Sequence, residues 1–393
     1  EEDGDHADDA HDADHDHDHD NYDAPAAHAA GGRRMTAREG LEPAASTRPA
    51  RARSLKVAVL AGGRSSEHDV SLSSGAAVRE GLRSGGHEVV WIEVGRDGAW
   101  RRDGEGEPLS ATPGAGLLAV DVAFPVLHGR FGEDGTVQGM LEMLDVAYVG
   151  SGVAASALCM DKVLFKELMV AARTIPQVDY SDVREAAFDA DAAGVLAKIA
   201  QLGLPVFVKP SHLGSSLGIV KVTAGEQLEQ ALRSAFTHDA RVIVEAAAPG
   251  IEVECGVLGS THDERSASGA VAAASVPGEI VFKGDFYDFD AKYEPGGMEL
   301  LVPARISDTA AARVRELALE AFARAGCDGL ARADFFVDGE SVLVNELNTM
   351  PGFTPTSVYA KLLAASGVEY PELVDRLCRL ALERHAALGA QAF

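Results

Sequence analysis

The sequence predicts an α/β and α+β protein, with an N-terminal parallel sheet followed by two further units. Between residues 55 and 144, short apolar strands alternate with glycine turns and helices, which is typical of a parallel α/β sheet. After about Ile175 the strand pattern becomes antiparallel. Two runs, Lys209–Gly218 and Asn345–Gly352, then place polar groups at strand ends, where ligands bind. The elements follow in chain order.

The composition describes a globular chain with an acidic extension. At 393 residues the chain is long enough for two or three domains, and its 46% hydrophobic content is ordinary. The formal net charge is −26, but residues 1–23 hold 12 acidic residues and no Lys or Arg. The remaining chain is only mildly acidic, so we expect neither nucleic acid nor a membrane as a partner.

Cysteine usage and hydropathy indicate the cellular compartment. The four cysteines are widely spaced and form no C-x-x-C pair, which favours reduced thiols over zinc or a disulfide framework. No run of 18 apolar residues and no signal-peptide pattern is present. The sequence therefore predicts a soluble, cytoplasmic protein.

Residues 1–53 are expected to be a disordered tail. The segment is rich in Asp and His at first and in Ala, Arg and Pro later, so it cannot bury enough apolar surface to offset its ordering entropy. One interpretation is metal binding by the histidines, and the other is an unselected extension. Composition favours the extension.

Residues 54–150 are expected to form the N-terminal α/β domain. A helix of small and apolar residues at Ser156–Val170 should then lead into the next domain. Within the first domain the pattern predicts strands at residues 55–60, 88–94 and 120–125, helices at 71–84 and 136–144, and a glycine-rich loop at 128–135.

Two α+β units should complete the chain, a central unit at residues 151–250 and a C-terminal unit at 251–393. In the central unit we expect strands at residues 204–208, 218–222 and 241–245 and a helix at 225–236. In the C-terminal unit we expect strands at 252–258, 270–276, 330–337 and 341–346, a helix at 307–325, and another from Pro371.

Two loops of the first domain carry candidate binding residues. Glu67 lies between a glycine turn and a helix, where it could bind a ligand or simply complement the helix dipole. His128 begins a loop at the carboxyl end of a strand, the edge at which open α/β sheets bind ligands. A lone histidine is often structural, and its placement favours a substrate role.

Lysines and a small-residue loop predict a phosphate site. Lys209 ends a strand and precedes the loop Gly214–Gly218, whose glycines and serines can expose backbone amides to phosphate. Lys162 is a second candidate cation. Neither run matches a Walker loop or a Rossmann fingerprint, so a different nucleotide-binding fold is implied.

Three oxygen-bearing side chains predict a metal site. Glu346 and Asn348 share one strand face because side chains alternate with a period of two, and Asp334 lies on the preceding strand of a hairpin. Mg²⁺ prefers such oxygen ligands together with phosphate oxygens. The alternative is a Glu–Arg ion pair that uses Arg332, and we favour the metal.

The motifs together resemble the D-alanine–D-alanine ligase family, whose members have the ATP-grasp fold. The resemblance covers residues 55–390 and implies that ATP lies between the central and C-terminal units, with the N-terminal domain contributing to the substrate site. The matching runs are residues 61–72, 128–141, 156–162, 209–218, 285–293, 329–334 and 345–352.

The resemblance implies roles at the nucleotide. Two Mg²⁺ (or Mn²⁺) ions would be held by Asp334, Glu346 and Asn348. Phosphate contacts would come from Lys162, Lys209, Lys292 and the loop that contains Ser216. The adenine would meet Glu245 and the backbone at Ala248, and the ribose would meet Glu252.

It also implies roles at the reacting groups. Glu67, Ser215 and Tyr293 would form a hydrogen-bonded triad at the ammonium of the first D-alanine, beside His128. Arg332 and the Gly352 amide would stabilise an oxyanion, and Ser357 would bind the carboxylate of the second substrate. The run Asp285–Tyr293 would be a closing lid. A homodimer is expected.

The implied reaction is ATP-dependent formation of D-alanyl-D-alanine through D-alanyl phosphate, for peptidoglycan precursors. A close alternative is D-lactate or D-serine as the second substrate, although the Ala291-Lys292-Tyr293 ending of the lid resembles that of dipeptide-forming relatives. Alternatives of other classes are a metal-binding protein acting through the Asp/His tail and a catalytically silent nucleotide-binding protein.

Overall fold

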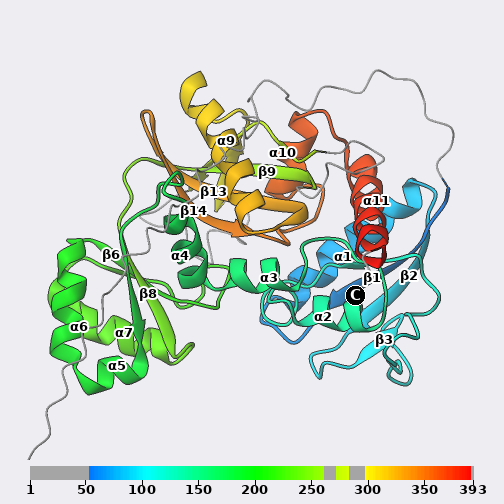
Figure 1. Ribbon diagram of the computed structural model, residues 1–393, viewed down its shortest axis with the longest axis horizontal. Helices are drawn as coiled ribbons and strands as arrows, with labels where there is room; N and C mark the ends of the chain where they lie inside the picture. Colours follow the sequence, from blue (N-terminus) through cyan, green and yellow to red (C-terminus); the bar gives the residue numbers. More distant parts are fainter. Residues whose placement is uncertain (1–52, 261–270, 283–296, 391–393) are drawn as a thin grey trace, which may run out of the picture. The chain divides into compact units, whose positions relative to one another are not determined.

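A computed structural model describes residues 53–260, 271–282 and 297–390 (Figure 1). Within these residues the strands form two four-stranded sheets and one six-stranded sheet. The tail, the predicted lid at Asp285–Tyr293 and residue Ala270 of one predicted strand lie outside the described residues.

The N-terminal sheet consists of β1 (Lys56–Gly62), β2 (Glu88–Val94), β3 (Trp100–Arg102) and β4 (Val122–Pro125), in the order β3-β2-β1-β4. β1 pairs in parallel with β2 and β4, as the sequence predicts. β3 is antiparallel to β2, so the expectation of a wholly parallel sheet is wrong at this edge. A three-residue strand is too short to leave a periodic pattern.

One of the two helices of this region differs from prediction. α1 (His68–Ser84) begins three residues before the expected start, and the His68 ring contacts the Gly63 carbonyl at 2.7 Å. α2 (Thr136–Met143) lies where it was predicted.

The predicted single helix at Ser156–Val170 is wrong, because the chain breaks at Asp161. α3 (Val153–Met160) ends and α4 (Lys162–Ala172) begins there. Asp161 has extended dihedrals, and its carboxylate accepts hydrogen bonds from the amides of Val163 and Leu164. Asp is a favoured N-cap residue, so the break had a signal that the run of small apolar residues masked.

The central sheet consists of β5 (Tyr180–Arg184), β6 (Val206–Pro210), β7 (Val220–Val222) and β8 (Arg241–Ala246), paired antiparallel in the order β5-β8-β6-β7. Its antiparallel pairing confirms the prediction, but β5 was not foreseen.

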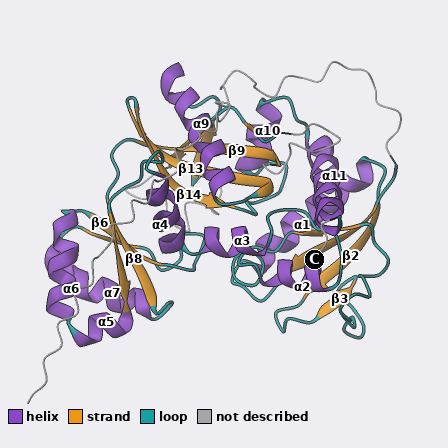
Figure 2. Ribbon diagram, viewed as in Figure 1, coloured by secondary structure: helices purple, strands orange, loops and turns teal. Residues whose placement is uncertain are grey.

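Three helices pack against one face of this sheet (Figure 2). They are α5 (Glu185–Ala190), α6 (Ala192–Ile199) and α7 (Leu228–Phe236), with short 3-10 turns at Ala200–Leu202 and Gly225–Gln227. Valines from the four strands fill the core beneath these helices. Since side chains alternate along a strand, Lys209 and Glu245 point to the opposite face.

The C-terminal sheet has the order β12-β11-β9-β13-β14, with β10 paired to β9. Its strands are β9 (Ile251–Ser260), β10 (Ala273–Ala274), β11 (Gly278–Phe282), β12 (Met298–Leu301), β13 (Asp328–Asp338) and β14 (Ser341–Asn348). The predicted strand at residues 270–276 shortens to β10, and β11 and β12 were not foreseen.

α9 (Asp308–Arg324) covers one face of this sheet. Ala331, Ala333 and Phe335 of β13 are buried in the core that includes α9. The alternate residues of β13 therefore belong to the other face, which carries the polar side chains.

The last two helices of the described chain are α10 (Val358–Ala365) and α11 (Tyr370–Gly389), and the second brings the end of the chain to the N-terminal sheet. α11 packs on α1, and its apolar residues share a core with β1 and β4. The rings of Phe124 on β4 and Phe353 lie 5.6 Å apart between centroids. This shared core fixes the segment before α10 beside the N-terminal sheet.

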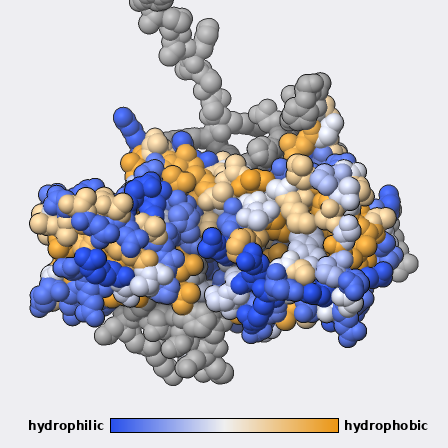
Figure 3. Space-filling model, turned by 90° about the horizontal axis from the view of Figure 1, so that it is seen from below, coloured by the Kyte–Doolittle hydropathy of each residue, from blue (hydrophilic) through white to orange (hydrophobic). Residues whose placement is uncertain are grey.

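On the face seen in Figure 3, hydrophilic and hydrophobic residues are interspersed over the described part of the chain. Exposed apolar side chains such as Met143, Val170 and Leu388 belong to different helices. Among the helices of the described residues, none is both long and apolar enough to cross a bilayer.

Candidate active site

The polar face of β13 and β14 depends on a β-bulge. Asp334 stands opposite Glu346 in the register, but the next residue, Phe335, stands opposite Val344. Asn345 is therefore the extra residue of a bulge. Without it, strict alternation would place Val344 and Glu346 on one face. The bulge lets Val344 stay in the core while Glu346 joins the polar face.

Arg332 lies at the centre of this face. Its Nε and Nη2 donate to the two carboxylate oxygens of Asp334, both at 2.7 Å, and Nε also lies 2.9 Å from Glu254 Oε2. Burial alone would lower the pKa of Arg332, but the charges of Asp334 and Glu254 raise it well above its usual value. The side chain is therefore a fixed, permanently charged group.

The three predicted metal ligands are brought together. Asp334 and Glu346 are cross-strand neighbours, and Asn348 Nδ2 donates to Asp334 Oδ2 at 2.9 Å. Across the described residues no three side chains among His, Cys, Asp and Glu converge as a metal site. Two carboxylates and an amide nevertheless suit Mg²⁺ when phosphate oxygens complete the shell. Asp334 also forms an ion pair with Arg332, which was not predicted from the sequence.

Lys209 belongs to a buried ionic row on the central sheet. Its Nζ lies 2.5 Å from one carboxylate oxygen of Glu245, and Lys166 Nζ lies 3.0 Å from the other. Burial opposes all three charges, but the two lysines lower the pKa of Glu245 to about 2. Glu245, predicted to meet adenine, thus also holds Lys209 in place.

The predicted phosphate loop joins this row to the N-terminal domain. Ser215 and Ser216 have φ of 51° and 58°, the left-handed region that is unusual for serine. Ser215 Oγ donates a hydrogen bond to Glu67 Oε1. Glu67 precedes α1 but makes no capping hydrogen bond, so its carboxylate is directed to the loop instead.

Lys162, the second predicted cation, reaches the same region from the start of α4. Its Nζ donates to the Leu213 carbonyl at 2.9 Å and lies 3.3 Å from Glu346 Oε2. The lysine therefore bridges the phosphate loop of the central unit and the acidic strand of the C-terminal unit.

A cavity connects these groups. Among the predicted residues it is lined by Lys162, Lys209, Ser215, Ser216, Glu252, Asp334 and Glu346. A separate cavity of about 330 Å³ lies by β5 and α6, and none of the predicted site residues lines it. The chemistry of the linings assigns the site to the first cavity.

Two carboxylates flank Gly129 at the N-terminal side of the site. Gly129 has φ of 73°, and a Cβ on it would lie 2.6 Å from Glu67 Oε2, so only glycine fits. Its amide donates to Glu133 Oε2 at 2.5 Å. Burial, and then the Glu67 charge, raises the pKa of Glu133 from 4.5 to about 8. A cation bound here would relieve the repulsion between the two carboxylates.

A Glu133→Gln substitution should remove a pH dependence of stability. Because the folded pKa exceeds the usual value, this group favours the folded state most below about pH 4.5 and loses that contribution as pH rises towards 8. The variant should therefore gain stability relative to the parent between about pH 5 and 8.5. Urea unfolding at both pH values measures the change, with the exposed Glu107→Gln as control. An equal difference in unfolding free energy between variant and parent at the two pH values would contradict this prediction.

His128 is held by protein groups at both ring nitrogens. Nδ1 lies 3.1 Å from the Met350 carbonyl, which can only accept, and Nε2 lies 3.1 Å from Ser74 Oγ. Burial lowers the pKa of His128, so the ring is neutral and Nε2 accepts from the serine. The structural role anticipated as an alternative is present, and a substrate role stays a prediction.

Gly352 and Ser357 lie together at the start of α10. Ser357 is the residue before the helix, and its Oγ would lie 3.3 Å from a Cβ on Gly352. Ser357 Oγ accepts from the Thr354 amide at 3.0 Å and makes no capping bond to α10. A helix N-terminus with a neighbouring hydroxyl suits a carboxylate.

The positions of the remaining predicted residues are described by the elements that carry them. Glu252 lies on β9 and lines the cavity. Ala248 lies between β8 and β9, and its neighbour Ala247 donates to the Pro205 carbonyl at 3.1 Å. Lys292 and Tyr293 lie outside the described residues.

Sequence reasoning missed three charged residues at the site. Glu254 was available from alternation, since it shares a strand face with Glu252. Glu133 lies within the glycine-rich loop that was singled out for His128 alone. Lys166 had no signal, because its partner Glu245 lies on a distant strand, β8, and only the fold brings the two together.

Facing basic and acidic sheets around this cavity define the ATP-grasp class of ATP-dependent enzymes. The family described as D-ala D-ala ligase C-terminus matches residues 169–379, and D-ala D-ala ligase N-terminus matches 56–115 and 102–151. The chain therefore belongs to the D-alanine–D-alanine ligase family.

Proteins similar to this chain carry the name of this family. D-alanine–D-alanine ligases of Kineococcus radiotolerans and Mycolicibacterium vanbaalenii are 44% and 43% identical to this chain, covering 85% of it and 98% and 99% of their own lengths. The D-alanine–D-alanine ligase structure from Coxiella burnetii has a TM-score of 0.75 at 31% identity, covering 86% of this chain and 96% of its own. The D-Ala:D-Ser ligase structure from Enterococcus faecalis has a TM-score of 0.73 at 32% identity, covering 84% and 100%.

Proposed function

We propose that this protein joins two D-alanines into D-alanyl-D-alanine for peptidoglycan precursors, with ATP activating the first carboxylate as D-alanyl phosphate. The contact of Ser215 with Glu67 carries the proposal. It connects the loop of the nucleotide site with Glu67, the residue proposed to bind the first D-alanine. A phosphoryl group and a substrate carboxylate could thus meet in one cavity.

The first step needs charge neutralisation around the phosphates. Lys209, held by Glu245, and Lys162, held at the loop, would contact phosphate oxygens, and the amides near Ser216 would cover them. The Glu67 carboxylate, with Glu133 across Gly129, would hold the ammonium of the first D-alanine. A carboxylate oxygen of this D-alanine then attacks the γ-phosphorus of ATP, and ADP leaves.

The second step needs an oxyanion site and an orientated amine. The carboxylate of the second D-alanine would lie at the start of α10 near Ser357, so that its amine faces the acyl carbon. Attack forms a tetrahedral oxyanion, which Arg332 and the Gly352 amide would stabilise. Phosphate departs, the attacking nitrogen loses its proton, and the dipeptide remains. Tyr293 is proposed to complete the triad with Glu67.

The donor set of β13 and β14 fits two Mg²⁺ or Mn²⁺ ions. Asp334, Glu346 and Asn348 would hold them, and bound ions would neutralise the β- and γ-phosphate oxygens. Lys162, which lies 3.3 Å from Glu346, balances that carboxylate in the structure.

A Glu346→Gln substitution should weaken metal binding by about 10- to 100-fold and nearly abolish turnover, because a neutral amide replaces a charged ligand. Mn²⁺ titration followed by magnetic resonance measures binding independently of activity. Glu299→Gln, on an exposed position of β12, is the control and should bind Mn²⁺ normally. Unchanged Mn²⁺ affinity in the first variant would exclude Glu346 as a ligand.

The second substrate is the point on which relatives differ. The similarity to the Enterococcus faecalis D-Ala:D-Ser ligase keeps D-serine as a candidate, and D-lactate remains the other. We infer that D-alanine is preferred, on the basis of the Ala291-Lys292-Tyr293 ending. Incubation with ATP and equal amounts of the three acceptors, followed by mass spectrometry, tests this. Dominance of D-alanyl-D-serine or D-alanyl-D-lactate would reject it.

We further infer a cytoplasmic homodimer that uses only ATP and D-alanine as partners. The family supports ATP and small-molecule substrates, and the mildly acidic body supports the absence of nucleic acid and membrane partners. Light scattering tests the dimer. Deletion of residues 1–34 should leave turnover unchanged, whereas a metal-binding protein that acts through the tail would lose its function.

A further inference from the structure

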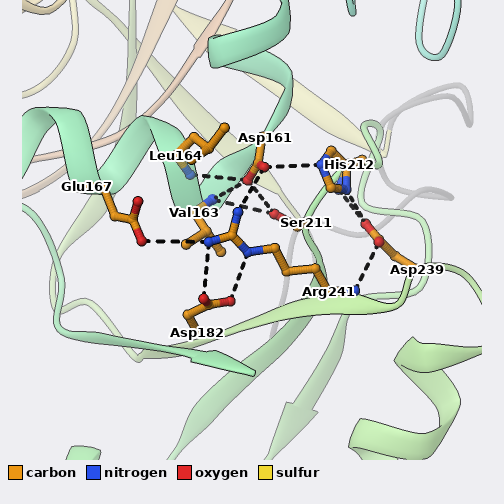
Figure 4. A network of polar contacts seen from close by, with 9 residues as sticks. All are labelled: Asp161, Val163, Leu164, Glu167, Asp182, Ser211, His212, Asp239 and Arg241. Carbon is orange, nitrogen blue, oxygen red and sulfur yellow. Dashed lines mark hydrogen bonds and ion pairs between the residues drawn. The ribbon is translucent and has the colours of Figure 1, made fainter. Parts of the chain in front are cut away.

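A network of polar contacts lies beside the phosphate loop (Figure 4). Arg241 at the start of β8 is its centre. Its guanidinium contacts Asp182 through Nε at 3.0 Å and Nη2 at 3.1 Å, and Asp161 through Nη1 at 3.1 Å. Glu167 of α4 lies 3.6 Å from Nη2. The arginine thus ties β5 and β8 to the start of α4.

Asp161 is the shared anchor of this network. One oxygen, Oδ1, caps α4 through the amides of Val163 and Leu164 at 3.0 and 3.1 Å and accepts from Ser211 Oγ at 2.7 Å. The other oxygen meets Arg241 and His212, each at 3.1 Å. Burial would raise the pKa of Asp161, but the hydrogen bonds from His212 and Ser211 lower it below its usual value.

His212 occupies the exposed edge of the network. Nε2 lies 3.1 Å from Asp161 Oδ2, and Nδ1 lies 2.7 Å from Asp239 Oδ2. Carboxylates only accept hydrogen bonds, so a ring that carries a proton on both nitrogens suits both contacts. The contacts with Asp161 and then Asp239 raise the pKa of His212 to about 9. Its backbone amide also donates to Asp239, at 2.8 Å.

The network fixes the segments that carry the phosphate-binding groups. Lys162 directly follows Asp161, and its amide donates to the Ser211 carbonyl at 3.1 Å. Leu213, the first residue after His212, accepts from Lys162 Nζ at 2.9 Å. The start of the loop and the cation beneath it are therefore held from both sides by Asp161 and His212.

We propose, on the basis of the proposed nucleotide site, that protonated His212 is a positioning residue that anchors the phosphate loop through Asp161 and Asp239. A neutral ring has one N–H, so one of the two carboxylates would face a lone pair. The other groups bonded to these carboxylates, Arg241 and Ser211, do not titrate in this range. Loss of the proton should therefore loosen the loop and weaken nucleotide binding.

Calorimetric titration with a non-hydrolysable ATP analogue and Mg²⁺, without D-alanine, tests this proposal. Omitting D-alanine removes the titrating amine of the substrate. For the parent protein, Kd should rise about threefold to tenfold between about pH 7.5 and 10, as expected for losing a half-exposed ion pair. His212→Gln should bind about as weakly at pH 7.5 as the parent does at pH 10, and its Kd should change less than the parent's between the two pH values.

Two further variants keep the test decisive. His212→Lys retains a charge with an ordinary pKa of about 10.4, so its affinity should stay high to more alkaline pH than the parent's. This variant also covers the case in which the glutamine variant fails to fold. His385→Gln removes a remote surface histidine that pairs with Asp145 at 3.4 Å, and its pH profile should match the parent's.

The outcomes separate the two proposals. Absence of any analogue binding by the parent at pH 7.5 would contradict the proposed function. Binding by the parent that does not vary with pH, or a His212→Gln profile equal to the parent's, would overturn the role of His212 while leaving the proposed function intact.

Discussion

Replacing Arg332 by alanine should lower kcat by about 10²- to 10³-fold, the usual effect of removing one oxyanion donor. Arg332 is the cation on the polar face of β13, and two hydrogen bonds to Asp334 and a contact with Glu254 hold its guanidinium. The positive charge is thus prepositioned before any oxyanion forms. Steady-state phosphate release at saturating ATP and D-alanine measures the effect.

Two variants serve as controls for the arginine. Arg332→Lys keeps the charge but loses the paired hydrogen bonds, so its kcat should lie between those of the parent and the alanine variant. Arg305→Ala removes another arginine that binds a single carboxylate, that of Glu279, with two hydrogen bonds, and should leave kcat unchanged. A kcat within twofold of the parent for folded Arg332→Ala would contradict the role in the oxyanion site.

Replacing Glu245 by glutamine should cost about 3–5 kcal/mol of the free energy of unfolding, because it removes the one negative charge between two buried lysines. Lys166 lies 3.0 Å and Lys209 2.5 Å from its carboxylate oxygens, and the Lys166 side chain is 1% exposed. Urea unfolding near pH 7 measures the loss. The pKa of about 2 means that this contribution is complete above about pH 4.5 and is lost as pH falls through about 2.

A second substitution distinguishes lost charge balance from general disruption. Adding Lys166→Met to Glu245→Gln removes one of the two lysines left unpaired, and should restore part of the stability. Lys198→Met, an exposed lysine of α6, should restore nothing. An unfolding midpoint of Glu245→Gln equal to that of the parent would show that the row contributes no net stability.

Local patterns predicted the parts of the site that lie along single strands. Glu346 and Asn348 were placed on one face by alternation, and they share that face in the structure. The bulge at Asn345 that brings them there could not be predicted, because a bulge is defined by the register with the partner strand. The same limit applies to Arg332, whose pairing with Glu254 depends on the neighbouring β9.

Packing between distant segments was beyond sequence patterns. Asp161 and Arg241 lie 80 residues apart, and only the fold, which brings the residue before α4 to the start of β8, places them in contact. α11 could be predicted as a helix, but its position on α1 beside β1 and β4 could not. The recognisable motifs therefore predicted the candidate reacting groups, while the groups that hold them in place emerged only from the fold.

The most direct test of the proposed reaction is the ratio of inorganic phosphate to dipeptide formed from ATP and D-alanine. Because one γ-phosphoryl group activates one carboxylate, purified protein should release one phosphate for each D-alanyl-D-alanine. Neither product should appear with L-alanine alone. Absence of phosphate release with D-alanine, or release without dipeptide, would contradict a ligase that couples the two halves of this site.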